Sequence, residues 1–129
     1  MAITSQYVAT PKNGTLAQAT VANTARDGTG TLVTILTAGT TGSRVDAIAF
    51  NAPGTVTAGM LRLFINIGAN TRLLDEIPVT ATTPSGTVPA WAVDYIPPTP
   101  IVLEAGALLR FAPNNAETFN AIPTYAGDF

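Results

Sequence analysis

The stretch from Met60 to Ile67 reads Met60-Leu61-Arg62-Leu63-Phe64-Ile65-Asn66-Ile67. Apolar side chains occupy every second position, so Leu61, Leu63, Ile65 and Ile67 share one face of an extended strand, opposite Met60, Arg62, Phe64 and Asn66. A turn signal, Gly68-Ala69-Asn70, follows, and an extended pattern resumes from Thr71 to Thr80, with Leu73, Ile77 and Val79 pointing one way. The two segments predict an antiparallel β-hairpin with a short loop.

Similar short segments recur along the chain. Each carries β-branched or aromatic residues between Gly, Pro, Asn or Ser. They are Leu16 to Asn23, Thr31 to Thr37, Arg44 to Asn51, Pro89 to Tyr95, Gly106 to Ala112 and Thr118 to Thr124. With the hairpin they make about eight strands, which predicts an all-β antiparallel sandwich or barrel.

Prolines and weakly patterned residues mark the expected boundaries. Proline cannot donate to a strand ladder, so Pro78 and Pro89 are expected at sheet edges or bulges. The run Pro97-Pro98-Thr99-Pro100 predicts a stiff connector that crosses between the sheets. We expect residues 1–14 to form an extended N-terminal arm and residues 15–129 to form one sandwich domain.

The composition argues against most catalytic and nucleic-acid-binding functions. The 129 residues include no cysteine and no histidine, so thiolate metal sites, disulfides and histidine chemistry are excluded. The formal net charge is −2, which leaves no broad basic surface for phosphates, and we expect no direct nucleic-acid contact. The sequence predicts no enzyme and no cofactor.

Membrane association and secretion are not expected either. The N-terminal residues lack a basic segment followed by an apolar run, as a secretory signal would have. The longest apolar stretches have four or five residues, whereas a membrane helix needs roughly 20.

Two acidic motifs are candidates for a catalytic or ion-binding site. Asp75 and Glu76 are adjacent, so on a strand they point to opposite faces and cannot serve one reacting centre. Asp27-Gly28-Thr29-Gly30 lacks the spaced ligands of a calcium loop and the lysine of a phosphate-binding loop, and it predicts a turn before the next strand. We predict no catalytic, cofactor-binding or metal site.

The scarcity of charge points instead to contact with other proteins. Only 11% of residues are charged against 47% hydrophobic, where a free-standing domain usually has about a quarter charged. Arginine suits desolvated interfaces, and Trp91 and Tyr95 share a strand face that fits core packing, subunit packing or sugar stacking. The interface candidates are Ile3, Tyr7, Val8, Arg44, Arg62, Trp91, Tyr95 and Arg110.

Several short motifs, taken in order, resemble one family. They are Arg44-Val45-Asp46-Ala47-Ile48-Ala49-Phe50, Met60-Leu61-Arg62-Leu63-Phe64-Ile65, Leu73-Leu74-Asp75-Glu76-Ile77-Pro78-Val79, Ile101-Val102-Leu103-Glu104-Ala105-Gly106-Ala107-Leu108-Leu109 and Ala126-Gly127-Asp128-Phe129. From about Thr15 to Phe129 the chain resembles the head decoration, or cement, proteins of tailed bacteriophages, which have a jelly-roll-like β-sandwich.

The resemblance implies a homotrimer on the outer surface of the virion, made in the host bacterial cytoplasm and bound to the major capsid protein. It implies no catalysis and no cofactor. The Pro97 to Pro100 segment and the loop at Asn114-Asn115 depart from the pattern. We expect the arm from Ala2 to Pro11 to lie along a neighbouring protein, with Ile3, Tyr7 and Val8 as apolar anchors.

Two alternatives remain open from the sequence. One is a carbohydrate-binding β-sandwich that uses Trp91 and Tyr95, and the other is a neck or tail component of a virion. An enzyme of the cupin type would need histidine ligands, which the chain lacks.

Overall fold

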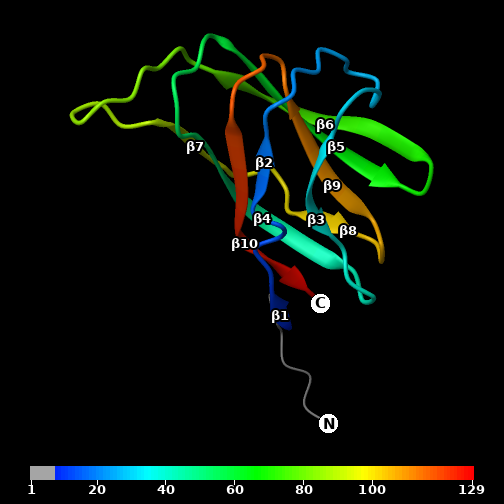
Figure 1. The fold of residues 1–129 in the computed structure, drawn as a ribbon. Coiled ribbons are helices and arrows are strands. Elements are labelled where there is room, and N and C mark those ends of the chain that lie inside the picture. The colour runs from blue at the N-terminus through cyan, green and yellow to red at the C-terminus, as the bar shows by residue number, and fades with distance from the viewer. Residues whose placement is uncertain (1–7) are drawn as a thin grey trace.

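The computed structural model describes residues 8–129, and these form an all-β, antiparallel sandwich of two sheets (Figure 1). The strands are β1 (Thr10–Pro11), β2 (Ala17–Ala19), β3 (Val33–Thr37), β4 (Ser43–Ala52), β5 (Gly59–Ile67), β6 (Asn70–Val79), β7 (Trp91–Tyr95), β8 (Ile101–Leu103), β9 (Leu108–Pro113) and β10 (Phe119–Asp128). Each of the predicted segments overlaps one of these strands. The two that the sequence did not predict, β1 and β8, have only two and three residues.

The strand order is that of a jelly roll, as predicted. In the six-stranded sheet, β10 and β4 lie at the centre, β1 and β2 both pair with the outer side of β10, and β7 and β8 both pair with β4. The four-stranded sheet has the order β3-β9-β5-β6. The chain changes sheet at most connections, which is how a jelly roll encloses one core between two sheets.

The proline-rich connector does not cross between the sheets, and that prediction is wrong. Tyr95 at the end of β7 pairs with Ile48, and Ile101 at the start of β8 pairs with Val45, so both strands lie against β4 in one sheet. The ten-residue β4 is long enough to take two short partners on one side. Prolines between them interrupt the pairing because they have no N–H to donate. Pro78 lies on the edge strand β6, as predicted, while Pro89 precedes β7.

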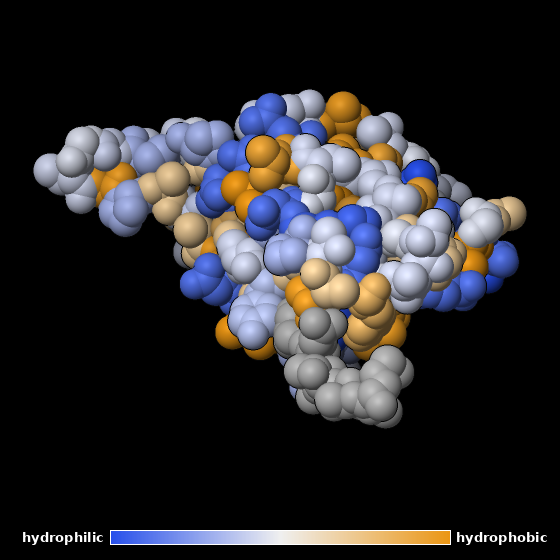
Figure 2. All heavy atoms as spheres, turned by 90° about the horizontal axis from the view of Figure 1, so that it is seen from below, coloured by the Kyte–Doolittle hydropathy of each residue, from blue (hydrophilic) through white to orange (hydrophobic). Residues whose placement is uncertain are grey.

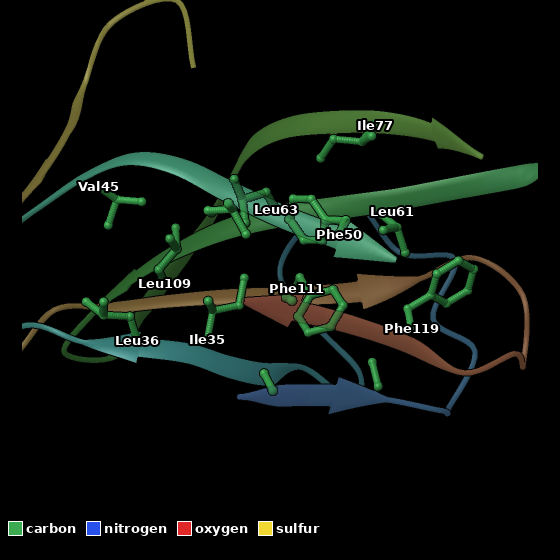
Figure 3. Close-up of a cluster of buried hydrophobic side chains, with 14 of the residues drawn as sticks. Ile35, Leu36, Val45, Phe50, Leu61, Leu63, Ile77, Leu109, Phe111 and Phe119 are labelled. Carbon is green, nitrogen blue, oxygen red and sulfur yellow. The ribbon is translucent and has the colours of Figure 1, made fainter. Parts of the chain in front are cut away.

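The core lies between the two sheets (Figure 3). Leu61 and Leu63 of β5 are fully buried there, and the Phe50 and Phe111 rings meet across the sandwich with centroids 5.9 Å apart. Burial of each such side chain contributes about 1.5–3 kcal/mol. The inward-facing period-two pattern of β5 is therefore what holds the hairpin in the fold.

A bulge in β6 corrects the predicted face of Leu73. Leu63 pairs with Asp75 and Phe64 pairs with Leu73, so Leu74 is an extra residue on β6. The extra residue reverses the alternation, which places Leu73 beside Phe64 on the outer face, while Ile77 and Val79 stay in the core.

The outer face of the four-stranded sheet is covered by the β2–β3 connection, residues 20–32, which we call the strap. Arg62, Phe64 and Asn66 alternate on that face of β5. The strap contacts Arg62 through Asn23, and Gly28 lies against Thr71, the partner of Asn66. The strap thus passes over Phe64, which is 0% exposed although it faces away from the main core.

Candidate interaction surface

An apolar groove lies beside the turn at residues 40–42. It has a volume of about 610 Å³ and lies between Ile65 and Ile67 of β5, Val102 of β8, the 40–42 turn and Phe129. A second hollow of about 340 Å³, between Leu74 and the proline-rich connector, shares Ile65 and Val102 with the first. We call the two together the end groove.

Large apolar side chains of the end groove are open to solvent. Val102 is 64% exposed, and Ile67, Leu74 and Phe129 are exposed as well. Figure 2 views the molecule from below and shows hydrophobic side chains reaching the surface among polar ones. The charged residues that line the end groove are Asp75 and Glu104. An apolar hollow with a slight negative charge is suited to holding part of another protein.

One polar pair lies in the wall of the second hollow. The Tyr95 hydroxyl donates a hydrogen bond of 2.7 Å to Oδ2 of Asp75. Burial, together with the neighbouring carboxylate, holds the pKa of Tyr95 well above its ordinary value. The phenol therefore stays neutral near pH 7 and remains a fixed donor to Asp75.

The outer face of the six-stranded sheet carries small and amide side chains. Gln18, Asn120 and Asn51 stand opposite one another on β2, β10 and β4. Gln18 donates to Asn120 over 2.9 Å, and Asn120 donates to Asn51 over 3.0 Å, which makes a row of amides across three strands. Ala92 and Asp94 of β7 extend this face and are exposed. This face thus presents amide and small side chains.

The structure removes two predicted interface residues from the surface. Arg62 is 4% exposed because Glu76 and the strap cover its guanidinium. Trp91 is 8% exposed, and its ring meets that of Phe119 edge to face at 5.9 Å. Trp91 and Tyr95 do share a face, as predicted, but that face turns into the sandwich, so they form no stacking platform for a sugar.

The other candidates are engaged within the chain or lie outside the described residues. Arg44 is half-buried and pairs with Asp46 at 2.9 Å, and half-buried Arg110 donates to the Thr34 hydroxyl. Val8 lies against Gly127. Ile3 and Tyr7 belong to residues 1–7, outside those described.

The arm is joined to the sandwich by its last residues. Thr10 and Pro11 pair with Asp128 and Gly127 of β10. Strand addition by this part of the arm therefore takes place on its own sheet rather than on a neighbour.

The acidic motifs adopt the predicted structural roles. Asp75 bonds to Tyr95 on one face of β6, and Glu76 bonds to arginines on the other. Asp27 accepts bonds from the Thr29 hydroxyl and amide in a turn before β3, and these bonds hold its pKa below the ordinary value of 3.8. Among residues 8–129 there is no group of three or more acidic side chains that could hold a metal ion.

Sequence reasoning missed the end groove. In the sequence, Val102 and Phe129 stand out only as parts of motifs, and Ile67 only as the end of a hairpin strand. The available signal was the placement of Ile96 and Ile101 on either side of four residues that contain three prolines. Such a run cannot pair as a central strand, so apolar residues beside it remain near a sheet edge.

Comparison of the chain with protein families, with curated proteins and with solved structures finds no match. Within the described part of the chain, no helix is long and apolar enough to cross a membrane.

Proposed function

We propose that this protein is a structural component of a virion that decorates and stabilises the outer surface of a tailed-phage capsid. It binds the major capsid protein and acts as a homotrimer, without catalysis or cofactor. The motifs that resemble head decoration proteins suggest this role, and the jelly-roll fold is compatible with it.

The end groove is the observation that supports the proposal most directly. Val102 and Ile67 come from different sheets, and both expose apolar surface into one hollow. Exposed apolar surface of this kind usually marks a contact with another protein. Among the residues that line the groove there is no lysine or arginine, so a partner segment that is apolar with a basic residue complements Asp75 and Glu104.

The proposed mechanism is mass action on the assembled shell. A protein that binds the closed lattice and not free capsid subunits adds its binding free energy to the stability of the lattice. Three linked copies raise the effective concentration of each contact, so one groove of modest size suffices per subunit. The rigid core fixes the relative positions of the loops and grooves that make these contacts.

The test is co-sedimentation with phage heads prepared without this protein. We expect saturable binding of the wild-type chain to heads and loss of at least about tenfold in affinity for Val102→Asp, because the groove would have to bury a new carboxylate. Val88→Asp is the matched control, since Val88 is also exposed (44%) but lies in the β6–β7 connection that projects away from the sandwich (Figure 1).

Three results would contradict the proposal. They are absence of wild-type binding to heads, binding to isolated tails instead, and equal loss of binding in both valine variants. The second of these would support the neck or tail alternative.

A further inference from the structure

The strap is tied to the four-stranded sheet at few points. Within the described residues, one hydrogen bond between main-chain atoms joins it to that sheet, from the Asn23 amide to the Pro113 carbonyl over 2.8 Å. The other ties run through two arginines, Arg62 beneath the strap and Arg26 within it. A segment with so few backbone bonds to its support is expected to open at a lower free energy than the core strands.

One carboxylate holds both arginines. Oε2 of Glu76 accepts from Nε of Arg26 at 2.8 Å and from Nε of Arg62 at 2.9 Å. Arg62 also donates through Nη1 to the Asn23 carbonyl at 3.2 Å and to the Asn114 side chain at 3.1 Å. Glu76 is thus the shared acceptor that links the strap, β5 and β6.

The strap covers a second, smaller apolar layer. Phe64 of β5 and Ala112 of β9 are both at most 1% exposed, yet neither belongs to the core between the sheets. Ala112 is paired with Arg62, so it lies on the same outer face. Gly28 allows the close approach: its φ is +88°, and a Cβ there would lie 2.7 Å from the Thr71 carbonyl oxygen.

We propose that residues 20–32 form an acid-sensitive strap latched by Glu76, and that its release exposes Phe64 and Ala112 while the sandwich stays folded. Protonation of Glu76 removes the charge that compensates the buried Arg62 and the strap's own Arg26. The strap then keeps the contacts of Asn23 with Pro113 and Arg62 and loses the ion pair between Arg26 and Glu76. This inference is independent of the proposed capsid role.

The charges around Glu76 fix the direction of the pH dependence. The hydrogen bond from Arg26 and the contact with Arg62 lower the pKa of Glu76 below its ordinary value of 4.5. A lowered pKa means that the stabilisation is fully present above pH 4.5 and is lost as the pH falls through the lower value in the folded state. The other charged residues on the strap, β6 and β9 are Asp27, Arg72, Asp75 and Arg110.

Of these, the arginines keep their charge throughout acid titration, and Asp75 faces the other side of β6. Asp27 is the remaining carboxylate on the strap, and Thr29 lowers its pKa as well. Because both carboxylates would respond in acid, the test must separate Glu76 from Asp27.

Thiol labelling can measure the opening directly, because the chain contains no cysteine of its own. Ala112→Cys places a small thiol under the strap, and Ala121→Cys places the same thiol in the main core, where Ala121 is 0% exposed. The ratio of the two labelling rates with a pyridyl disulfide reports strap opening separately from unfolding of the sandwich. At neutral pH, Glu76→Gln should raise this ratio at least about tenfold, because Arg26 and Arg62 both lose the carboxylate that compensates their charge.

Glu104→Gln makes the same change at an exposed carboxylate of the end groove and should leave the ratio unchanged. With Glu76 present, the ratio of the labelling rates should rise as the pH falls from 7 to below 4.5. With Glu76→Gln, the same ratio should depend little on pH. An unchanged ratio in Glu76→Gln, equal acceleration at both thiols, or a full acid response that persists in Glu76→Gln would each overturn the proposal. The last result would assign the acid response to Asp27.

Discussion

The outer faces of the two sheets differ: the chain's own strap covers one, and the other carries exposed side chains. The four-stranded sheet buries its outer face under the chain's own strap, with Arg62 and Phe64 beneath it. The six-stranded sheet leaves a row of amides and small side chains in the open, from Gln18 across to Asn51. A chain with 11% charged residues thus uses the cluster of Arg26, Glu76 and Arg62 to hold a cover on one face and carries amide and small side chains on the other.

Among residues 8–129, most basic side chains pair with carboxylates of the same chain. Of six basic residues, four pair with carboxylates of the same chain: Lys12, Arg26, Arg44 and Arg62. Arginine is an interface candidate in the sequence because it suits desolvated contacts. Here the desolvated contact of Arg62 lies within the chain, and the apolar end groove is the contact surface that we propose instead.

Truncating one polar residue on each face compares the two faces directly. This pair of variants should show the largest difference in the free energy of unfolding. Arg62→Ala removes a buried guanidinium and leaves the Asn23 carbonyl and the Asn114 amide without their donor, so the free energy of unfolding should fall by about 3 kcal/mol. Asn120→Ala on the open face breaks two bonds of a half-buried amide and should cost about 1 kcal/mol. Urea unfolding of both variants measures the difference, and equal losses would contradict the assignment of one covered and one open face.

A smaller loss of stability is expected when a side chain is added to Gly28, where the strap comes close to β6. Gly28→Ala forces a φ of +88° on an alanine and a Cβ against Thr71, so it should destabilise the folded state by about 2 kcal/mol. Gly86→Ala is the matched control, because a Cβ there meets nothing within 4 Å and the change should stay within about 0.5 kcal/mol. Thermal unfolding of the two variants gives the comparison, and a Gly28 variant as stable as the control would mean that the strap does not press on the sheet.

The sequence predicts eight of the ten strands, but it does not predict which segment covers them. Period-two alternation between Leu61 and Ile67 and the glycine after it predict the hairpin, because both signals are local. The bulge at Leu74 is a property of pairing between two strands, and it reverses the face of Leu73 without any local sign.

The sequence could not predict which face of a strand points into the sandwich. Alternation places Trp91 and Tyr95 on one face, but only the sheet order says that this face is the inner one. The strap has no periodic pattern, and its contacts join Asn23 to Arg62 and Arg26 to Glu76, pairs far apart in sequence. The end groove likewise forms only where β5, β8 and the C-terminal Phe129 meet in space.

Imaging of the virion tests the central claim, that the exposed apolar surface of this sandwich is covered by capsid protein. Electron cryomicroscopy of intact phage should show threefold clusters of the jelly roll on the outside of the head, with Val102 and Ile67 facing the shell. Exterior density that leaves the end groove open to solvent, or the absence of any such density on the head, would contradict the account.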